Sequence, residues 1–119
     1  MSFRRTLAAV LLAGALYAAD PVADKANKLI ADKKYDEAIT ALEASKTKNA
    51  DIQKSLVNAY MGKGDALMAN PQLPPRQKYP EALRSYRKVL TYDKNNKKAQ
   101  ESVAMIEGIY KQMGRPIPQ

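Results

Sequence analysis

The chain of 119 residues is long enough for one domain and contains neither histidine nor cysteine. Without histidine it has no Ser-His or Cys-His nucleophile pair and no His-based metal site. Without cysteine it has no disulfide, zinc-thiolate site or iron–sulfur cluster. Lys and Arg exceed Asp and Glu by 20 to 12, a net charge of +8, which permits an anionic partner.

Residues 1–19 have the layout of a secretory signal peptide. A short basic start precedes an apolar run from Leu7 to Ala19, and small residues precede Asp20. The run is shorter than the roughly 20 apolar residues that span a bilayer. We expect cleavage near Ala18 or Ala19 and export to the periplasm or the cell exterior. The sequence matches a signal for the general secretory route better than one for the twin-arginine route. We expect membrane contact only through the transient signal peptide or through weak binding of an anionic surface.

The remaining chain has helical periodicity throughout, and no segment alternates with a period of two for long enough to predict a strand. Apolar residues recur three and four positions apart, as at Tyr79, Ala82, Leu83 and Tyr86. The sequence therefore predicts an all-α domain over residues 20–113. Its expected helices are at residues 22–32, 36–46, 51–69, 80–92 and 97–113.

Prolines mark two of the expected breaks. Pro71, Pro74 and Pro75 predict an extended proline-rich loop over residues 70–78, because proline cannot continue a helix. Pro80 then falls in the first turn of the next helix, where its missing N–H costs nothing. Residues 114–119, with two further prolines, are predicted to form a disordered tail.

Two segments of the chain align on each other. Residues 35–42 and 79–86 share the pattern Tyr-x-Glu-Ala-(Ile/Leu)-x-x-(Leu/Tyr) at an offset of 44. The alanine three positions after the tyrosine marks a place where two helices approach closely. Helix pairs that cannot bury their apolar faces alone must stack on one another.

This repeat resembles the tetratricopeptide repeat (TPR). Asn58–Asp65 resembles the end of the first helix of a repeat with its Gly-Asp turn, and Tyr92–Asn96 resembles the closing turn, with Lys94 where the family usually has proline. The offset exceeds the usual period of about 34 because residues 66–78 add 13 residues, while the link after Ser45 is about three residues short. The resemblance implies a right-handed superhelical stack of two antiparallel helix pairs plus a C-terminal capping helix.

The resemblance also implies a concave groove, lined by the first helix of each pair, that holds an extended peptide of a partner protein. Asn27 and Asn58 fall at equivalent positions, and their amides can hydrogen-bond a peptide backbone. Ala23 stands where the carboxylate-clamp subfamily has lysine. The predicted groove residues are Asn27, Ile30, Lys54, Asn58, Met61, Lys98, Glu101 and Met105, with Ala23 beside them.

A basic face offers an alternative site, for lipid headgroups or an anionic cell-wall polymer. Export argues against nucleic acid as its target, and a solvated surface is the simplest interpretation of its charge. The residues concerned are Arg84, Arg87, Lys88, Lys94, Lys97 and Lys98.

Catalytic, cofactor and metal sites are not expected. Glu37 and Glu81 hold the same repeat position, and Asp36, Asp65 and Asp93 sit at helix starts or turns, where capping explains them. The spacing of acidic residues matches no EF-hand. The sequence thus predicts an exported, non-enzymatic interaction or scaffold module that binds a peptide segment, with self-association possible.

Overall fold

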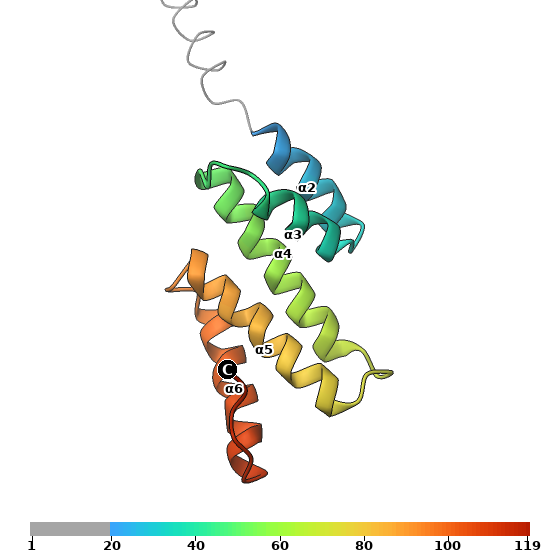
Figure 1. The fold of residues 1–119 in the computed structure, drawn as a ribbon, viewed down its shortest axis with the longest axis vertical. Helices are drawn as coiled ribbons and strands as arrows, with labels where there is room; N and C mark the ends of the chain where they lie inside the picture. Colours follow the sequence, from blue (N-terminus) through green and yellow to red (C-terminus); the bar gives the residue numbers. More distant parts are fainter. Residues whose placement is uncertain (1–19) are drawn as a thin grey trace, which may run out of the picture.

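The computed structural model describes residues 20–119, and the predicted signal peptide lies outside the described residues. Within this part the chain forms five α-helices and no strand (Figure 1), so the all-α prediction is confirmed. None of these helices is long and apolar enough to span a membrane. The helices are α2 (Pro21–Ala31), α3 (Tyr35–Glu43), α4 (Ala50–Ala69), α5 (Pro75–Tyr92) and α6 (Lys97–Gln112).

Side-chain caps fix where three helices begin. The side-chain oxygens of Asp20, Asn49 and Asn96 each accept a hydrogen bond from a backbone N–H two or three residues later. Asn49 also donates its Nδ2 to Asp20 Oδ2 at 2.9 Å, which ties the start of α4 to the start of α2. This bond is the main reason that the pKa of Asp20 lies below its ordinary value.

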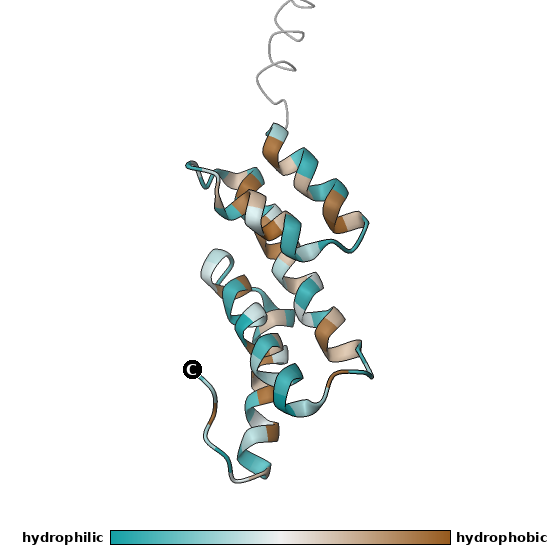
Figure 2. Cartoon of the chain, turned by 45° about the vertical axis from the view of Figure 1, so that its right-hand side comes forward, coloured by the Kyte–Doolittle hydropathy of each residue, from teal (hydrophilic) through white to brown (hydrophobic). Residues whose placement is uncertain are grey.

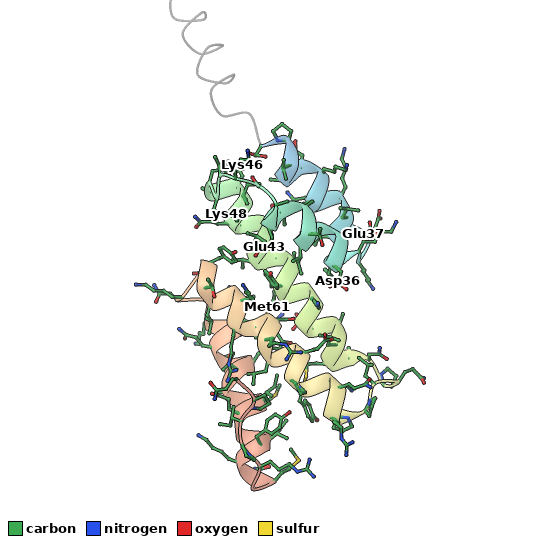
Figure 3. All side chains as sticks on the ribbon, viewed as in Figure 1. Asp36, Glu37, Glu43, Lys46, Lys48 and Met61 are labelled. Carbon is green, nitrogen blue, oxygen red and sulfur yellow. The ribbon has the colours of Figure 1, made fainter. Side chains whose placement is uncertain are left out.

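The end of α3 is set by a lysine. Lys48 Nζ donates to the backbone carbonyls of Glu43 and Ser45, so α3 ends at Glu43 rather than at the expected residue 46. Figure 3 shows Glu43, Lys46 and Lys48 together at the connection between α3 and α4. A cation there satisfies carbonyls that lack helical partners.

Helix α4 is the element on which α2, α3 and α5 pack. Helices α2 and α3 contact it, α5 makes the most extensive contact with it, and α6 packs against α5 (Figure 1). Hydrophobic positions along the helices are interrupted by hydrophilic ones (Figure 2), as expected for helices with one buried face.

The buried apolar residues form two groups. The first core cluster joins α2, α3 and the early part of α4, and consists of Ala23, Ala26, Ala38, Leu42, Ile52, Leu56, Ala59 and Tyr60 with Val89 and Ala99. The second core cluster joins α5 and α6 and consists of Ala82, Leu83, Tyr86, Ile106 and Tyr110. Met61, in the middle part of α4 (Figure 3), packs against both clusters.

The repeated motif occupies matching environments in α3 and α5. Ala38 and Ala82 are both fully buried, and Leu42 and Tyr86 at the last motif position are buried as well. A small residue at the first of these positions lets neighbouring helices approach closely. The internal repeat is therefore a repeat of packing as well as of sequence.

Helix α4 runs unbroken to Ala69, close to the helix expected over residues 51–69, so the Gly-Asp turn that the TPR resemblance implies at Gly62–Asp65 is not formed. The ring of Tyr35 packs over Gly62 and the ring of Tyr86 packs over Gly64, so closely that a Cβ added at the two glycines would lie 2.2 Å and 2.7 Å from ring carbons. Glycine inside a helix costs about 1 kcal/mol relative to alanine. Packing of two aromatic rings offsets that cost and keeps the helix intact.

The proline-rich loop is shorter than predicted. Helix α5 begins at Pro75, with Pro74 as its N-cap residue, so residues 75–78 are helical and Pro80 lies inside the helix. Proline suits the first helical position, and Pro80 removes only one backbone hydrogen bond, toward Arg76. The second hairpin is consequently longer than the first, since α4 and α5 have 20 and 18 residues against 11 and 9 for α2 and α3.

The C-terminal tail is packed rather than disordered. Gly114 has a φ of 64°, and the N–H of Arg115 bonds to the carbonyl of Tyr110 at 3.0 Å, a glycine-based helix end that reverses the chain. Arg87 Nη1 then donates to the carbonyl of Pro118 at 2.7 Å. Residues 115–118 therefore return toward α5.

The glycine–tyrosine packing predicts opposite effects for two Gly→Ala substitutions. Gly64→Ala should lower the free energy of unfolding by about 1–3 kcal/mol, because the buried ring of Tyr86 cannot move away from the new methyl group. Gly108→Ala is the matched control in α6, where an added Cβ meets nothing within 4 Å. It should stabilise by up to about 1 kcal/mol through helix propensity. Urea unfolding measures both; equal stabilisation would contradict the packing.

A tyrosine–glutamate bond predicts a specific loss of stability at high pH. Tyr92 OH donates to Glu43 Oε1 at 2.5 Å, joining the ends of α5 and α3, and this bond, followed by burial, raises the pKa of Tyr92 to about 12. The native state keeps a proton that the unfolded state releases near pH 10, so the contribution is complete below about pH 10 and is lost as the pH rises through about 12.

Tyr92→Phe removes this contribution. In urea unfolding at about pH 8 the variant should be about 1 kcal/mol less stable than the unsubstituted chain. The difference should shrink above about pH 10 and vanish near pH 12. A difference that stays constant over this range would show that the hydroxyl makes no such bond.

Candidate peptide-binding face

Four residues predicted for the groove meet at one place. A shallow hollow of about 350 Å³ lies between α2 and α4. Ala23 and Asn27 reach it from α2, and Lys54 and Asn58 reach it from α4. Its full lining is Ala23, Asp24, Asn27, Asp51, Lys54, Ser55 and Asn58.

Helical spacing and small residues build this hollow. Ala23 and Asn27 are one turn apart on α2, as Lys54 and Asn58 are on α4, so each pair shares a helix face. Ala23 and Ala26 are buried against the first core cluster, and their small side chains bring α2 close to α4. Polar groups from two helices thus face the same space.

The two asparagines are used differently. Asn27 Oδ1 accepts a hydrogen bond from Ser55 Oγ at 2.8 Å, which satisfies a hydroxyl that is only 3% exposed. The Nδ2 donors of Asn27 stay available at the exposed edge of the hollow. Asn58 is exposed, and its amide forms no side-chain hydrogen bond within residues 20–119. Together the amides offer donors and an acceptor, the groups that an extended backbone needs.

A stripe of α4 leads from the hollow toward α6. Lys54, Asn58, Met61 and Asp65 are spaced by four, three and four residues and so share one side of the helix. Asp65 Oδ2 accepts from Lys98 Nζ of α6 at 3.0 Å, and its Oδ1 accepts from Tyr86 OH at 2.6 Å. Burial and this bond raise the pKa of Tyr86.

Lys98 therefore lies near the side of α4 that carries Lys54 and Asn58, where it pairs with Asp65. Its side chain and that of Asp65 are 67% and 42% exposed. An ion pair as exposed as this contributes little to stability, so a ligand can replace it. Glu101 and Met105 of α6 are exposed, and Met105 is 52% accessible.

Two predicted groove residues lie elsewhere. Ile30 is half-buried and packs against the first core cluster, and half-buried Met61 packs against both clusters. Neither lines the hollow between α2 and α4. Their apolar side chains are used where helices meet, so their contribution is to packing.

The alternative basic face is only partly available. Arg87 binds the carbonyl of Pro118 and lies 3.4 Å from Glu107, and Lys98 pairs with Asp65. Arg84 lines a separate hollow of about 370 Å³ on α5 with Arg76 and Pro80. The remaining members, which are exposed, are Lys88, Lys94 and Lys97.

Sequence reasoning missed three residues that line the hollow. Asp24, Asp51 and Ser55 stand beside the predicted asparagines and lysine. Asp51 lies in the first turn of α4, and Asn49 is the cap of that helix. The spacing of Asp51, Ser55 and Asn58 along α4 is the signal that places all three on one helix face.

Comparisons with known proteins assign no family to the chain. No family model matches it, and no curated protein or solved structure is significantly similar to it. Within the part of the chain that the structure describes, no group of three or more acidic side chains could hold a metal ion. The polar groups that line the hollow between α2 and α4 are two amides, two carboxylates, one ammonium group and one hydroxyl.

The different use of the two asparagines predicts different effects on stability. Asn27→Ala leaves the buried Ser55 hydroxyl without its acceptor, so it should be about 1 kcal/mol less stable than Asn58→Ala. Both substitutions gain the same helix propensity, which cancels in the comparison. Thermal melts of the two variants provide the test, and identical melting temperatures would mean that the Asn27–Ser55 bond contributes nothing.

Proposed function

We propose that this chain is an exported, non-enzymatic interaction module that holds an extended peptide segment of a partner protein on the face formed by α2, α4 and α6. The observation that carries the proposal is the meeting of Asn27, Lys54 and Asn58 in one hollow, from helices that are distant in sequence. The repeat register places Asn27 and Asn58 at equivalent positions.

The contacts between the helices support the proposal of a TPR-like stack. Helix α2 contacts both α3 and α4, α4 contacts α5, and α5 contacts α6, as expected for two helix pairs and a capping helix. The Asn27–Ser55 and Lys98–Asp65 bonds link α2 and α6 to α4. In the proposed right-handed superhelix, these three helices are the ones that line the concave side.

The lining indicates what kind of segment fits. The asparagine amides suit the N–H and C=O groups of an extended backbone. Asp24 and Asp51 outnumber Lys54 in the hollow and favour a basic side chain of the ligand there, and Lys98 favours an acidic one farther along. The ligand is therefore expected to be polar, with its charges separated along its length.

Export is supported by the position of the first described helix. Helix α2 begins at Pro21, directly after the region expected for signal cleavage. Removal of residues 1–19 would leave the Asp20 cap in place, because its bonds to Val22 and Asn49 lie within the mature chain. A signal peptide followed at once by a stable helix start is consistent with a secreted domain.

The test is capture of a partner from envelope extract with the exported protein as bait. The double variant Lys54→Ala with Asn58→Ala should retain at most about a tenth of the partner, since losing two polar contacts of about 0.5–1.5 kcal/mol each lowers affinity about tenfold. Lys88→Ala with Asn95→Ala is the matched control, because it removes the same residue types at exposed positions outside the hollow. It should bind normally.

The basic face predicts the opposite result. Loss of capture in the Lys88→Ala, Asn95→Ala control, together with binding that weakens steeply as salt rises, would identify the basic face as the site. Normal capture by the Lys54→Ala, Asn58→Ala variant would exclude the hollow between α2 and α4.

A further inference from the structure

The C-terminal tail lies on α5 and α6 as an extended peptide would. After the reversal at Gly114 it runs back from the end of α6 (Figure 2). Ile117 is half-buried and packs against the second core cluster, and the carbonyl of Pro118 accepts a hydrogen bond from Arg87 Nη1 at 2.7 Å. One side chain and one backbone carbonyl thus anchor the segment.

The tail sequence makes this segment rigid and leaves its backbone groups available. Pro116 and Pro118 fix φ and lack N–H groups, and a residue that precedes proline, such as Ile117, favours extended conformations. Such a segment cannot add to a helix, and it loses little conformational freedom when it binds. Proline-containing extended peptides are recognised in this way by apolar surfaces that also carry a hydrogen-bond donor.

The surface beneath the tail is built on rigid elements. Nη2 of Arg87 in α5 lies 3.4 Å from Oε2 of Glu107 in α6, and each side chain is 33% exposed. This pair orients the guanidinium so that its other nitrogen meets the Pro118 carbonyl. The apolar floor for Ile117 is the second core cluster, which α5 and α6 supply together.

This surface is distinct from the candidate peptide-binding face. Glu107 and Met105 are two residues apart in α6 and therefore point to different sides of the helix. The hollow between α2 and α4 includes no residue of α5 or α6. The tail therefore leaves the hollow uncovered.

We propose that the surface formed by Arg87, Glu107 and the second core cluster is a second peptide-binding site. It recognises an extended segment of another protein in which an aliphatic residue precedes proline, and residues 115–118 fill it in cis. Arg87 donates a hydrogen bond to a main-chain carbonyl of the bound segment, and the second core cluster packs against its aliphatic side chain.

The tail is a displaceable occupant of this site. Beyond the bond of the Arg115 N–H that closes α6, the tail is anchored by the Ile117 packing and the Arg87 bond, and each of these two contacts is weak on its own. Tethering compensates, because a short linker gives an effective concentration in the millimolar range. A partner segment with the same anchors and additional contacts can therefore replace it.

The experiment uses the ¹⁵N-labelled full chain and a synthetic peptide Gly-Arg-Pro-Ile-Pro-Gln with both ends blocked. Ile117→Asp should release the tail without changing the surface beneath it. Peptide titration of this variant should then shift the resonances of the Arg87 side chain and of nearby α5 and α6 amides, with saturation. In the unsubstituted chain the apparent affinity should be at least about fivefold weaker, because the tail competes.

Two controls separate recognition from non-specific contact. A peptide with aspartate in place of isoleucine should cause no saturable shift, and Arg87→Gln combined with Ile117→Asp should lose most of the affinity. Ile117→Ala provides a second, milder way to release the tail, with the same expected direction.

Several results would overturn the proposal. These are equal peptide affinity with the tail anchored and released, no saturable shift in either released variant, and unchanged affinity after Arg87→Gln. A further contradicting result can come from analytical sedimentation, which measures the oligomeric state of the unsubstituted chain. An Ile117-dependent dimer would show that the tail occupies a second copy instead of its own chain.

Discussion

The continuity of α4 through Gly62 and Gly64 is the constraint on which the described structure depends. Both core clusters pack against this helix, and two tyrosine rings lie over its glycines at distances that exclude a larger residue. If the chain turned at these glycines, as their local preference suggests, Tyr35 and Tyr86 would lose their packing surface. The same unbroken helix carries Ser55 and Asp65, which bond Asn27 of α2 and Lys98 of α6, and the candidate peptide-binding face requires both bonds.

Periodicity was enough to predict the helices and most of the core. Residues such as Ala38, Leu42, Ala82 and Tyr86 recur at helical spacing, and burial follows directly from that spacing. The errors occurred where local preference and tertiary packing disagree. The TPR resemblance implies a turn at the glycines of α4, where glycine favours a helix end, but ring packing keeps the helix intact, as its periodicity predicts. The Pro116–Pro118 tail has the composition of a free end, but one arginine bond and one apolar contact hold it.

The candidate site was predictable to the extent that the repeat register determines helix faces. Asn27, Lys54 and Asn58 meet because α2 packs against α4 and these residues lie on the sides of the two helices that border the hollow. Met61 was assigned to the same face and yet is half-buried, because it lies where the two core clusters join. That junction depends on the length of α5, whose start at Pro75 the proline-rich segment obscured in the sequence. The hydrogen bond between Ser55 and Asn27 was not predictable from the sequence, because tertiary packing brings these two distant residues together.

The division of the core also determines how the molecule can open. Helix α2 rests on the first core cluster alone, whereas α4 contacts both clusters, so α2 can detach while α4 stays folded. In such a partly opened molecule Lys54 and Asn58 would remain in place and Asn27 would be absent, leaving half of the hollow. A ligand that spans α2 and α4 binds only the closed form and draws the population toward it by mass action. Amide hydrogen exchange in α2 would then report ligand occupancy directly.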